Sequence, residues 1–148
     1  MREFLAGFIL LSLCCLCHAT SFDMQGVVFK PGRPVMGESI ELAVLAPSEL
    51  GGLVNTVKSL KSNPAFRIEI VGHVDEAECR GKVCRRLAQR RAVYVFRHLL
   101  ATGVDPKQII SIRESGSALP ISTDKSERWR NRRAELLLRD DLFDSPDL

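Results

Sequence analysis

Three short segments of this chain carry polar residues whose types and spacing could bind a charged ligand. The tetrapeptide Gly-His-Val-Asp at 72–75 follows an alternating apolar and polar run, Arg91 comes later in a helical pattern, and Asn-Arg-Arg at 131–133 opens a last strand. An acid just beyond the end of a strand lies at the rim of a sheet, where ligands usually meet α/β layers. An acid and a guanidinium at such a rim predict a site for one zwitterionic group.

Arg91 is the strongest single candidate. At about 100° per residue, it lies on the same side of its predicted helix as Cys84 and Val95, against the body of the domain. A half-buried guanidinium needs an anionic partner, because an unpaired charge there is costly. Its fork geometry suits a carboxylate. The partner could be a ligand or an internal Asp or Glu, and spacing alone leaves both open.

Asp75 also allows two interpretations. It could cap a turn or the next helix, or it could accept hydrogen bonds from a ligand ammonium. His73, Asp75, Glu76 and Glu78 are of metal-ligand types, but no second ligand pair lies near them, so we expect no metal site. The sequence has no Gly-x-Ser-x-Gly motif and no glycine-rich phosphate loop. We therefore expect neither an enzyme nor a cofactor.

The first 19 residues have the features of a secretory signal peptide. Residues 4–17 are almost entirely apolar, and Cys-His-Ala at 17–19 places small residues where signal peptidase cuts. We predict cleavage after Ala19. The run is short for a membrane span, which needs about 20 residues. An uncleaved anchor is one alternative, and a lipoprotein signal using one of the cysteines near the cut is another.

Cys79 and Cys84 remain after this cleavage. In an oxidising compartment, two cysteines so close together most simply form a disulfide. The closed loop is short, so the entropic gain is small, and the expected role is to pin the start of the following helix. A metal site is the weaker alternative, because no second ligand pair stands nearby.

Basic residues concentrate in two blocks, at 80–97 and at 128–133. The predicted export argues against nucleic acid as a partner, and one Tyr, one Trp and seven Phe are few for stacking bases. The blocks form either a solvated basic face or an attraction for an anionic polymer of the cell envelope.

The elements that must position these residues follow from periodicity and turn signals. With 148 residues, the chain is long enough for one domain. Residues 39–45 are a short strand or a turn of helix, 115–120 are a loop, and 122–130 are a loop with a helical turn. We predict helices at 47–62 and 84–102 and strands at 26–29, 66–72, 109–112 and 134–139. This order predicts an α/β two-layer sandwich, a mixed β-sheet with two main helices on one face.

Four segments describe the expected organisation of the chain. They are a signal peptide at 1–19, an N-terminal segment with the first strand or strands at 20–46, a domain core at 47–139 and a flexible acidic tail at 140–148.

Four motifs then appear in a characteristic order. They are a strand with Gly-His-Val-Asp at 68–75, Leu-Ala-Gln-Arg-Arg-Ala at 87–92, Gly-Val to Ile-Ile at 103–110 and Asn-Arg-Arg-Ala-Glu at 131–135. In this combination, which covers roughly residues 47–139, the chain resembles the OmpA-like domain family, the peptidoglycan-binding modules of outer membrane protein A, Pal and MotB.

The resemblance implies non-covalent binding of the peptidoglycan stem peptide through diaminopimelate, tethering an envelope component to the wall. Asp75 would meet the ammonium of diaminopimelate and Arg91 its carboxylate. Asn131 and Arg132 would line or support the pocket, and His73 and Val74 belong to the same motif. It further implies the periplasm of a Gram-negative cell, with the outer membrane as a candidate attachment, and a larger envelope complex as a candidate partner.

Three departures from the family pattern leave alternatives open. Val74 stands where the family usually has Thr, Ala88 where it has Ser, and Lys30 where an Asp follows the first strand. These changes favour an OmpA-like structural adaptor of a secretion or motility machine that has lost wall binding. A second alternative is a small metal-dependent envelope hydrolase using His73 and Asp75.

Overall fold

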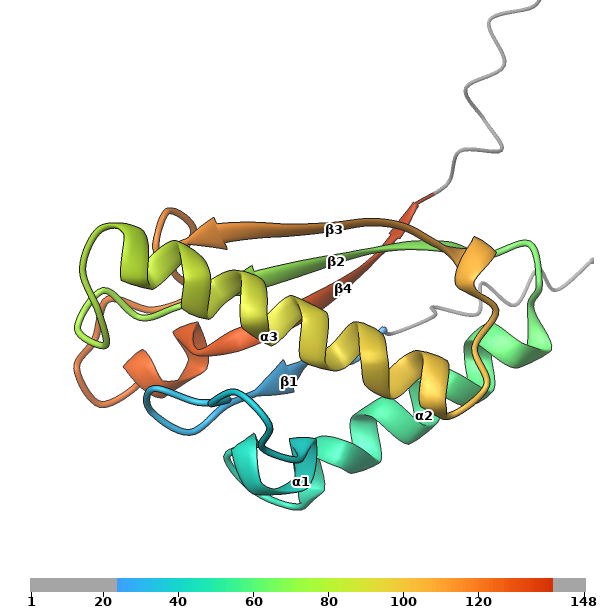
Figure 1. The fold of residues 1–148 in the computed structure, drawn as a ribbon, viewed down its shortest axis with the longest axis horizontal. Helices are drawn as coiled ribbons and strands as arrows, with labels where there is room; N and C mark the ends of the chain where they lie inside the picture. The colour runs from blue at the N-terminus through green and yellow to red at the C-terminus, as the bar shows by residue number, and fades with distance from the viewer. Residues whose placement is uncertain (1–23, 140–148) are drawn as a thin grey trace, which may run out of the picture.

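A mixed four-stranded sheet forms the centre of the fold in the computed structural model, which describes residues 24–139 (Figure 1). The strand order is β1-β4-β2-β3. β2 and β3 are parallel, and the other two pairs are antiparallel. The strands are β1 (Val27–Val28), β2 (Arg67–His73), β3 (Ile109–Gly116) and β4 (Arg133–Arg139). The predicted signal peptide and acidic tail lie outside the described residues.

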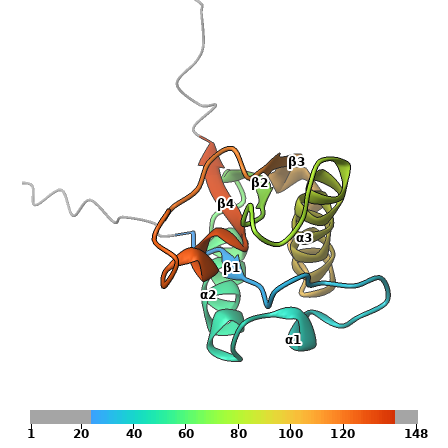
Figure 2. The ribbon, with the colours of Figure 1, turned by 90° about the vertical axis from the view of Figure 1, so that its left-hand side faces the viewer.

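Two main helices cover one face of this sheet, as Figure 2 shows from the end of the molecule. They are α2 (Ser48–Ser62) and α3 (Lys82–Ala101). The shorter elements are α1 (Ile40–Ala43) and the 3₁₀ turns η1 (Pro106–Gln108) and η2 (Arg128–Asn131). The predicted two-layer α/β architecture is therefore confirmed.

The core lies between the helices and the sheet. Ile68 and Ile70 alternate along β2 and point to the same face, where they meet Val95 and Leu99 of α3, four residues apart on one side of the helix. Leu53 of α2 joins the same buried cluster. Residues 27–29 and 40–44 also contribute buried apolar side chains to it, so the segment before 47 packs into the same core.

Gly72 lets α3 approach β2 closely. A Cβ at this position would lie 1.8 Å from the carbonyl oxygen of Ala88, a backbone atom that cannot move aside. The absence of a side chain therefore brings α3 down onto the end of β2, beside the loop that follows it.

Two elements differ from the expectation. β3 continues to Gly116, beyond the predicted end at 112, because Arg113 and Glu114 pair with Val71 and Gly72 of β2. β3 is one of the two outer strands of the sheet, where polar side chains are tolerated. The ambiguous segment at 39–45 contains the single helical turn α1. Within residues 24–139, no helix has the length and apolar character to cross a membrane.

Candidate ligand-binding site

Three segments meet at one end of the sheet (Figures 1 and 2). β2 and β3 run parallel, so the loops that follow them, 74–81 and 117–127, leave the same edge. η2 enters β4 at that edge because β4 is antiparallel to β2. The N–H of Val74 donates to the Gly116 carbonyl at 2.9 Å and links the first two loops. The polar residues singled out in the sequence thus lie where loops converge on a rigid scaffold.

A small pocket of about 50 Å³ opens between these loops. A volume of this size holds one or two water molecules or an ammonium group. A wider open cleft of about 720 Å³ adjoins it and shares Glu76 and Ser117 with it. The residues around the small pocket include Val74, Asp75, Glu76, Ser122, Arg128 and Asn131.

Asp75 is the one acid of this pocket that is buried, with 4% of its surface exposed. Its Oδ1 accepts from the Ala77 N–H at 2.9 Å, a local turn bond, and its Oδ2 accepts from Nδ2 of Asn131 at 3.1 Å. Among residues 24–139, no cation forms an ion pair with it. A carboxylate offers about four acceptor positions, so Asp75 keeps capacity for a donor from outside the chain.

Asn131 holds the opposite wall in place. Its Oδ1 accepts from the N–H groups of Ile121 and Ser122 at 2.8 and 3.1 Å, while Nδ2 donates to the Ser122 carbonyl at 2.7 Å and to Asp75. One side chain therefore joins the loop after β3 to the acid after β2. Asn131 supports the pocket as a brace.

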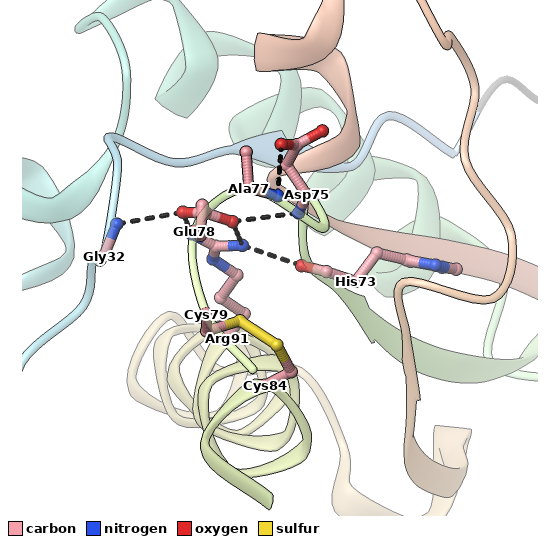
Figure 3. Close-up of a disulfide and its surroundings, with 8 residues drawn as sticks. All are labelled: Gly32, His73, Asp75, Ala77, Glu78, Cys79, Cys84 and Arg91. Carbon is pink, nitrogen blue, oxygen red and sulfur yellow. Dashed lines mark hydrogen bonds and ion pairs between the residues drawn. A yellow bond between two sulfur atoms is a disulfide. The ribbon is translucent and has the colours of Figure 1, made fainter. Parts of the chain in front are cut away.

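Arg91 is fully buried, and groups of this chain occupy its guanidinium; Figure 3 shows two of them, Glu78 and His73. It forms a two-pronged ion pair with Glu78, with Nη2 to Oε1 at 2.6 Å and Nη1 to Oε2 at 2.9 Å. The remaining N–H groups donate to the carbonyls of Arg33, His73 and Lys30 at 2.9, 2.8 and 3.4 Å. All five donors of the guanidinium have partners.

Glu78 is bound in the manner of a ligand carboxylate. Its side chain is only 5% exposed, and besides Arg91 it accepts from the backbone N–H groups of Gly32 and Asp75, both at 2.9 Å. Of the two partners that the sequence allowed for Arg91, the structure contains the internal one. A ligand carboxylate would reach Arg91 only if Glu78 left, so direct contact between Arg91 and a ligand stays a prediction.

The predicted disulfide between Cys79 and Cys84 is present, with their Cα atoms 5.1 Å apart. It joins the residue after Glu78 to the first turn of α3. The bridge thus fixes the segment that carries Glu78 against the helix that carries Arg91 (Figure 3).

His73 and Arg132 contact other parts of the domain and do not line the pocket. Nε2 of His73 lies 3.1 Å from Oε2 of Glu135. Burial, followed by the nearby Arg133, lowers the pKa of His73 below its usual value of 6.5. Arg132 donates from Nε to the Phe29 carbonyl at 3.1 Å and braces the end of β1. Within the described part of the chain, no three His, Cys, Asp or Glu side chains gather around a common point that could hold a metal.

Sequence reasoning missed two residues of this region. Glu78 was one of several acids in the loop, and no periodicity showed which acid would reach Arg91. The sequence shows Arg128 only as part of a basic block, yet it lines the pocket, and its Nη2 donates to Oε1 of Glu76 at 2.6 Å. Its spacing of three residues from Asn131 was the available signal.

Comparisons with known proteins agree with this architecture. Residues 40–134 match the family model described as the OmpA family. No match was found among curated proteins.

Several solved structures are similar to this chain. The peptidoglycan-associated lipoprotein from Burkholderia pseudomallei is 26% identical with a TM-score of 0.62, over 78% of this chain and 90% of that one. The C-terminal domain of Helicobacter pylori MotB is 21% identical with a TM-score of 0.63, over 82% and 87%. The periplasmic domain of the same protein is 24% identical with a TM-score of 0.57, over 78% and 73%. Because the family model covers most of the described fold, the chain belongs to the OmpA family.

Proposed function

We propose that this chain binds the stem peptide of peptidoglycan without covalent chemistry and tethers an envelope component to the cell wall from the periplasm. The observation that carries the proposal is Asp75, a buried carboxylate on a pocket wall with no cation partner among residues 24–139. An ionised group so placed is stabilised by a cation from outside the chain. The ammonium at the end of diaminopimelate fits that requirement.

The surroundings of the pocket support a peptide ligand. The pocket of about 50 Å³ admits an ammonium and its carbon, and the adjoining cleft of about 720 Å³ leaves room for the rest of the stem. Arg80, Lys82 and Arg85 line that cleft, and their positive charge attracts the carboxylates that the stem carries. The likeness to a peptidoglycan-associated lipoprotein points to the same class of ligand.

The test is a pull-down of the mature chain on purified sacculi with a matched pair of variants. Asp75→Asn removes the charge that binds the ammonium. Asp105→Asn is the control, because Asp105 makes the same local bond: at the start of η1, its Oδ1 accepts from the Lys107 N–H at 2.9 Å. We expect Asp75→Asn to weaken retention at least tenfold while Asp105→Asn leaves it unchanged. Equal retention of both variants, with unaltered circular dichroism, contradicts the assigned pocket.

One observation favours a second function. Glu78 occupies the guanidinium of Arg91. This favours an OmpA-like adaptor that belongs to a secretion or motility machine and does not itself bind the wall. A wild-type chain that stays in the supernatant with sacculi, but copurifies with another envelope protein, would establish this alternative.

A further inference from the structure

The ligand of the proposed site carries a carboxylate as well as an ammonium, and Arg91 is poorly placed to receive it. Glu78 is tethered within the same chain, so its effective concentration at the guanidinium is in the millimolar range or above. Its carboxylate also accepts four hydrogen bonds, two from the guanidinium and two from the backbone N–H groups of Gly32 and Asp75. A ligand carboxylate has to break this buried pair to make the same contacts, and gains nothing by doing so.

Arg128 is an arginine that lines the small pocket, whereas Arg91 is not among the residues that line it. Arg128 is the first residue of η2, and Asn131 is the last. Side chains three residues apart eclipse one another in a 3₁₀ turn, so Arg128 projects on the same side as Asn131, which contacts Asp75 at 3.1 Å. Both residues line the pocket that Asp75 lines.

The present partner of Arg128 is easily displaced. Its Nη2 bonds Oε1 of Glu76, the residue next to Asp75 in the chain, at 2.6 Å. The side chain of Glu76 is 68% exposed and that of Arg128 is 28% exposed. Exposed ion pairs of this kind contribute about 0 to 1 kcal/mol. Glu76 can therefore turn into solvent at little cost when another carboxylate arrives.

We propose that Arg128, in place of Arg91, binds the carboxylate of the ligand whose ammonium binds Asp75, and so selects diaminopimelate stems over lysine stems. This inference rests on the proposed function. The ammonium enters the small pocket, and the carboxylate stays at its rim against Arg128. A lysine side chain ends in an ammonium alone, so it makes the Asp75 contact and leaves Arg128 paired with Glu76. One charge-assisted contact of this kind corresponds to about a tenfold preference.

The experiment is a calorimetric titration of the mature chain with two synthetic stem tripeptides, one ending in meso-diaminopimelate and the other in lysine. The variants are Arg128→Gln, Glu76→Gln and the control Arg130→Gln. Arg130 belongs to the same turn and pairs with Glu127 at 3.7 Å, away from the residues that line the pocket. All three positions are at the surface or only partly buried, so the variants keep the fold.

We expect the wild type and Arg130→Gln to prefer the diaminopimelate peptide by about tenfold. Arg128→Gln should lose this preference while binding the lysine peptide as before, and Glu76→Gln should bind the diaminopimelate peptide a few-fold more tightly. If Arg128→Gln still prefers the diaminopimelate peptide, the inference is overturned and the proposed function stands. The same holds if the wild type binds both peptides equally. A wild type that binds neither peptide overturns the proposed function and the inference with it.

Discussion

Replacing Glu78 with alanine would leave a buried guanidinium without its counter-charge. Arg91 is fully buried, and the variant would keep only the bonds to the carbonyls of Arg33, His73 and Lys30. Removing one partner of a buried ion pair costs about 3 to 5 kcal/mol. The backbone N–H groups of Gly32 and Asp75 would also lose their acceptor. We therefore expect the free energy of unfolding to fall by about 4 kcal/mol.

This loss is large beside the stability of a domain of this size, about 5 to 15 kcal/mol. It corresponds to a decrease of about 10 to 20 °C in the melting temperature. The assay is urea unfolding of the mature chain, followed by far-ultraviolet circular dichroism with the disulfide kept oxidised. Glu76→Ala is the matched control, because its pair with Arg128 is exposed and its loss should cost less than about 1 kcal/mol.

A double variant separates the charge from the packing. In Glu78→Leu with Arg91→Met, both charges are replaced by apolar groups of similar length, so no buried ion stays unpaired. Such replacements are often neutral or stabilising, and we expect at least half of the loss to be recovered. A single variant that loses less than about 1 kcal/mol would refute the claim that this pair is a buried structural lock, and so would a double variant less stable than Glu78→Ala.

Two further predictions concern the scaffold. Gly72→Ala should destabilise the domain by more than about 3 kcal/mol, because the added Cβ would overlap the Ala88 carbonyl. Gly51 lies on α2 with open space around it, so Gly51→Ala should stabilise the domain by about 0.5 to 1 kcal/mol. Thermal unfolding of both variants checks the difference. The pKa of His73 is lowered in the native chain, so below pH about 6.5 the unfolded chain takes up a proton that the native chain does not. The free energy of unfolding is therefore unaffected above that pH. Below it, this free energy should fall by up to about 1.4 kcal/mol for each unit of decreasing pH. His73→Gln should flatten that dependence in urea titrations between pH 7 and 5, and an unchanged slope would exclude His73 as its source.

Much of the fold followed from local patterns. The alternation at 66–71 and the helical stripe before Gly103 predicted β2 and α3 nearly to their ends. The part of β3 beyond residue 112 could not be predicted from local patterns, because Arg113 and Glu114 show no apolar alternation. Their strand conformation is imposed by pairing with β2. Long-range pairing of this kind overrides local propensity.

The site was predictable only where a residue's neighbours determine its role. Asp75 and Asn131 each follow or precede a strand at the same sheet edge, so their meeting could be inferred from topology. The partner of Arg91 depended on the path of loop 74–81, which has no periodicity to read. The disulfide was a partial guide, because a bridge from Cys79 to the first turn of α3 carries the adjacent Glu78 toward that helix.

Two arginine–glutamate pairs lie at this end of the sheet. They show that the distance between the partners does not tell whether the arginine is free to bind a ligand. Arg91 with Glu78 and Arg128 with Glu76 have the same shortest separation, 2.6 Å. The first pair is excluded from water, where opening it exposes an uncompensated charge to a low dielectric. The second has an exposed glutamate and a partly exposed arginine, so water can replace the partner when the pair opens. A ligand carboxylate would therefore compete more readily at Arg128 than at Arg91, and this difference in exposure is the reason why we propose Arg128 as its partner.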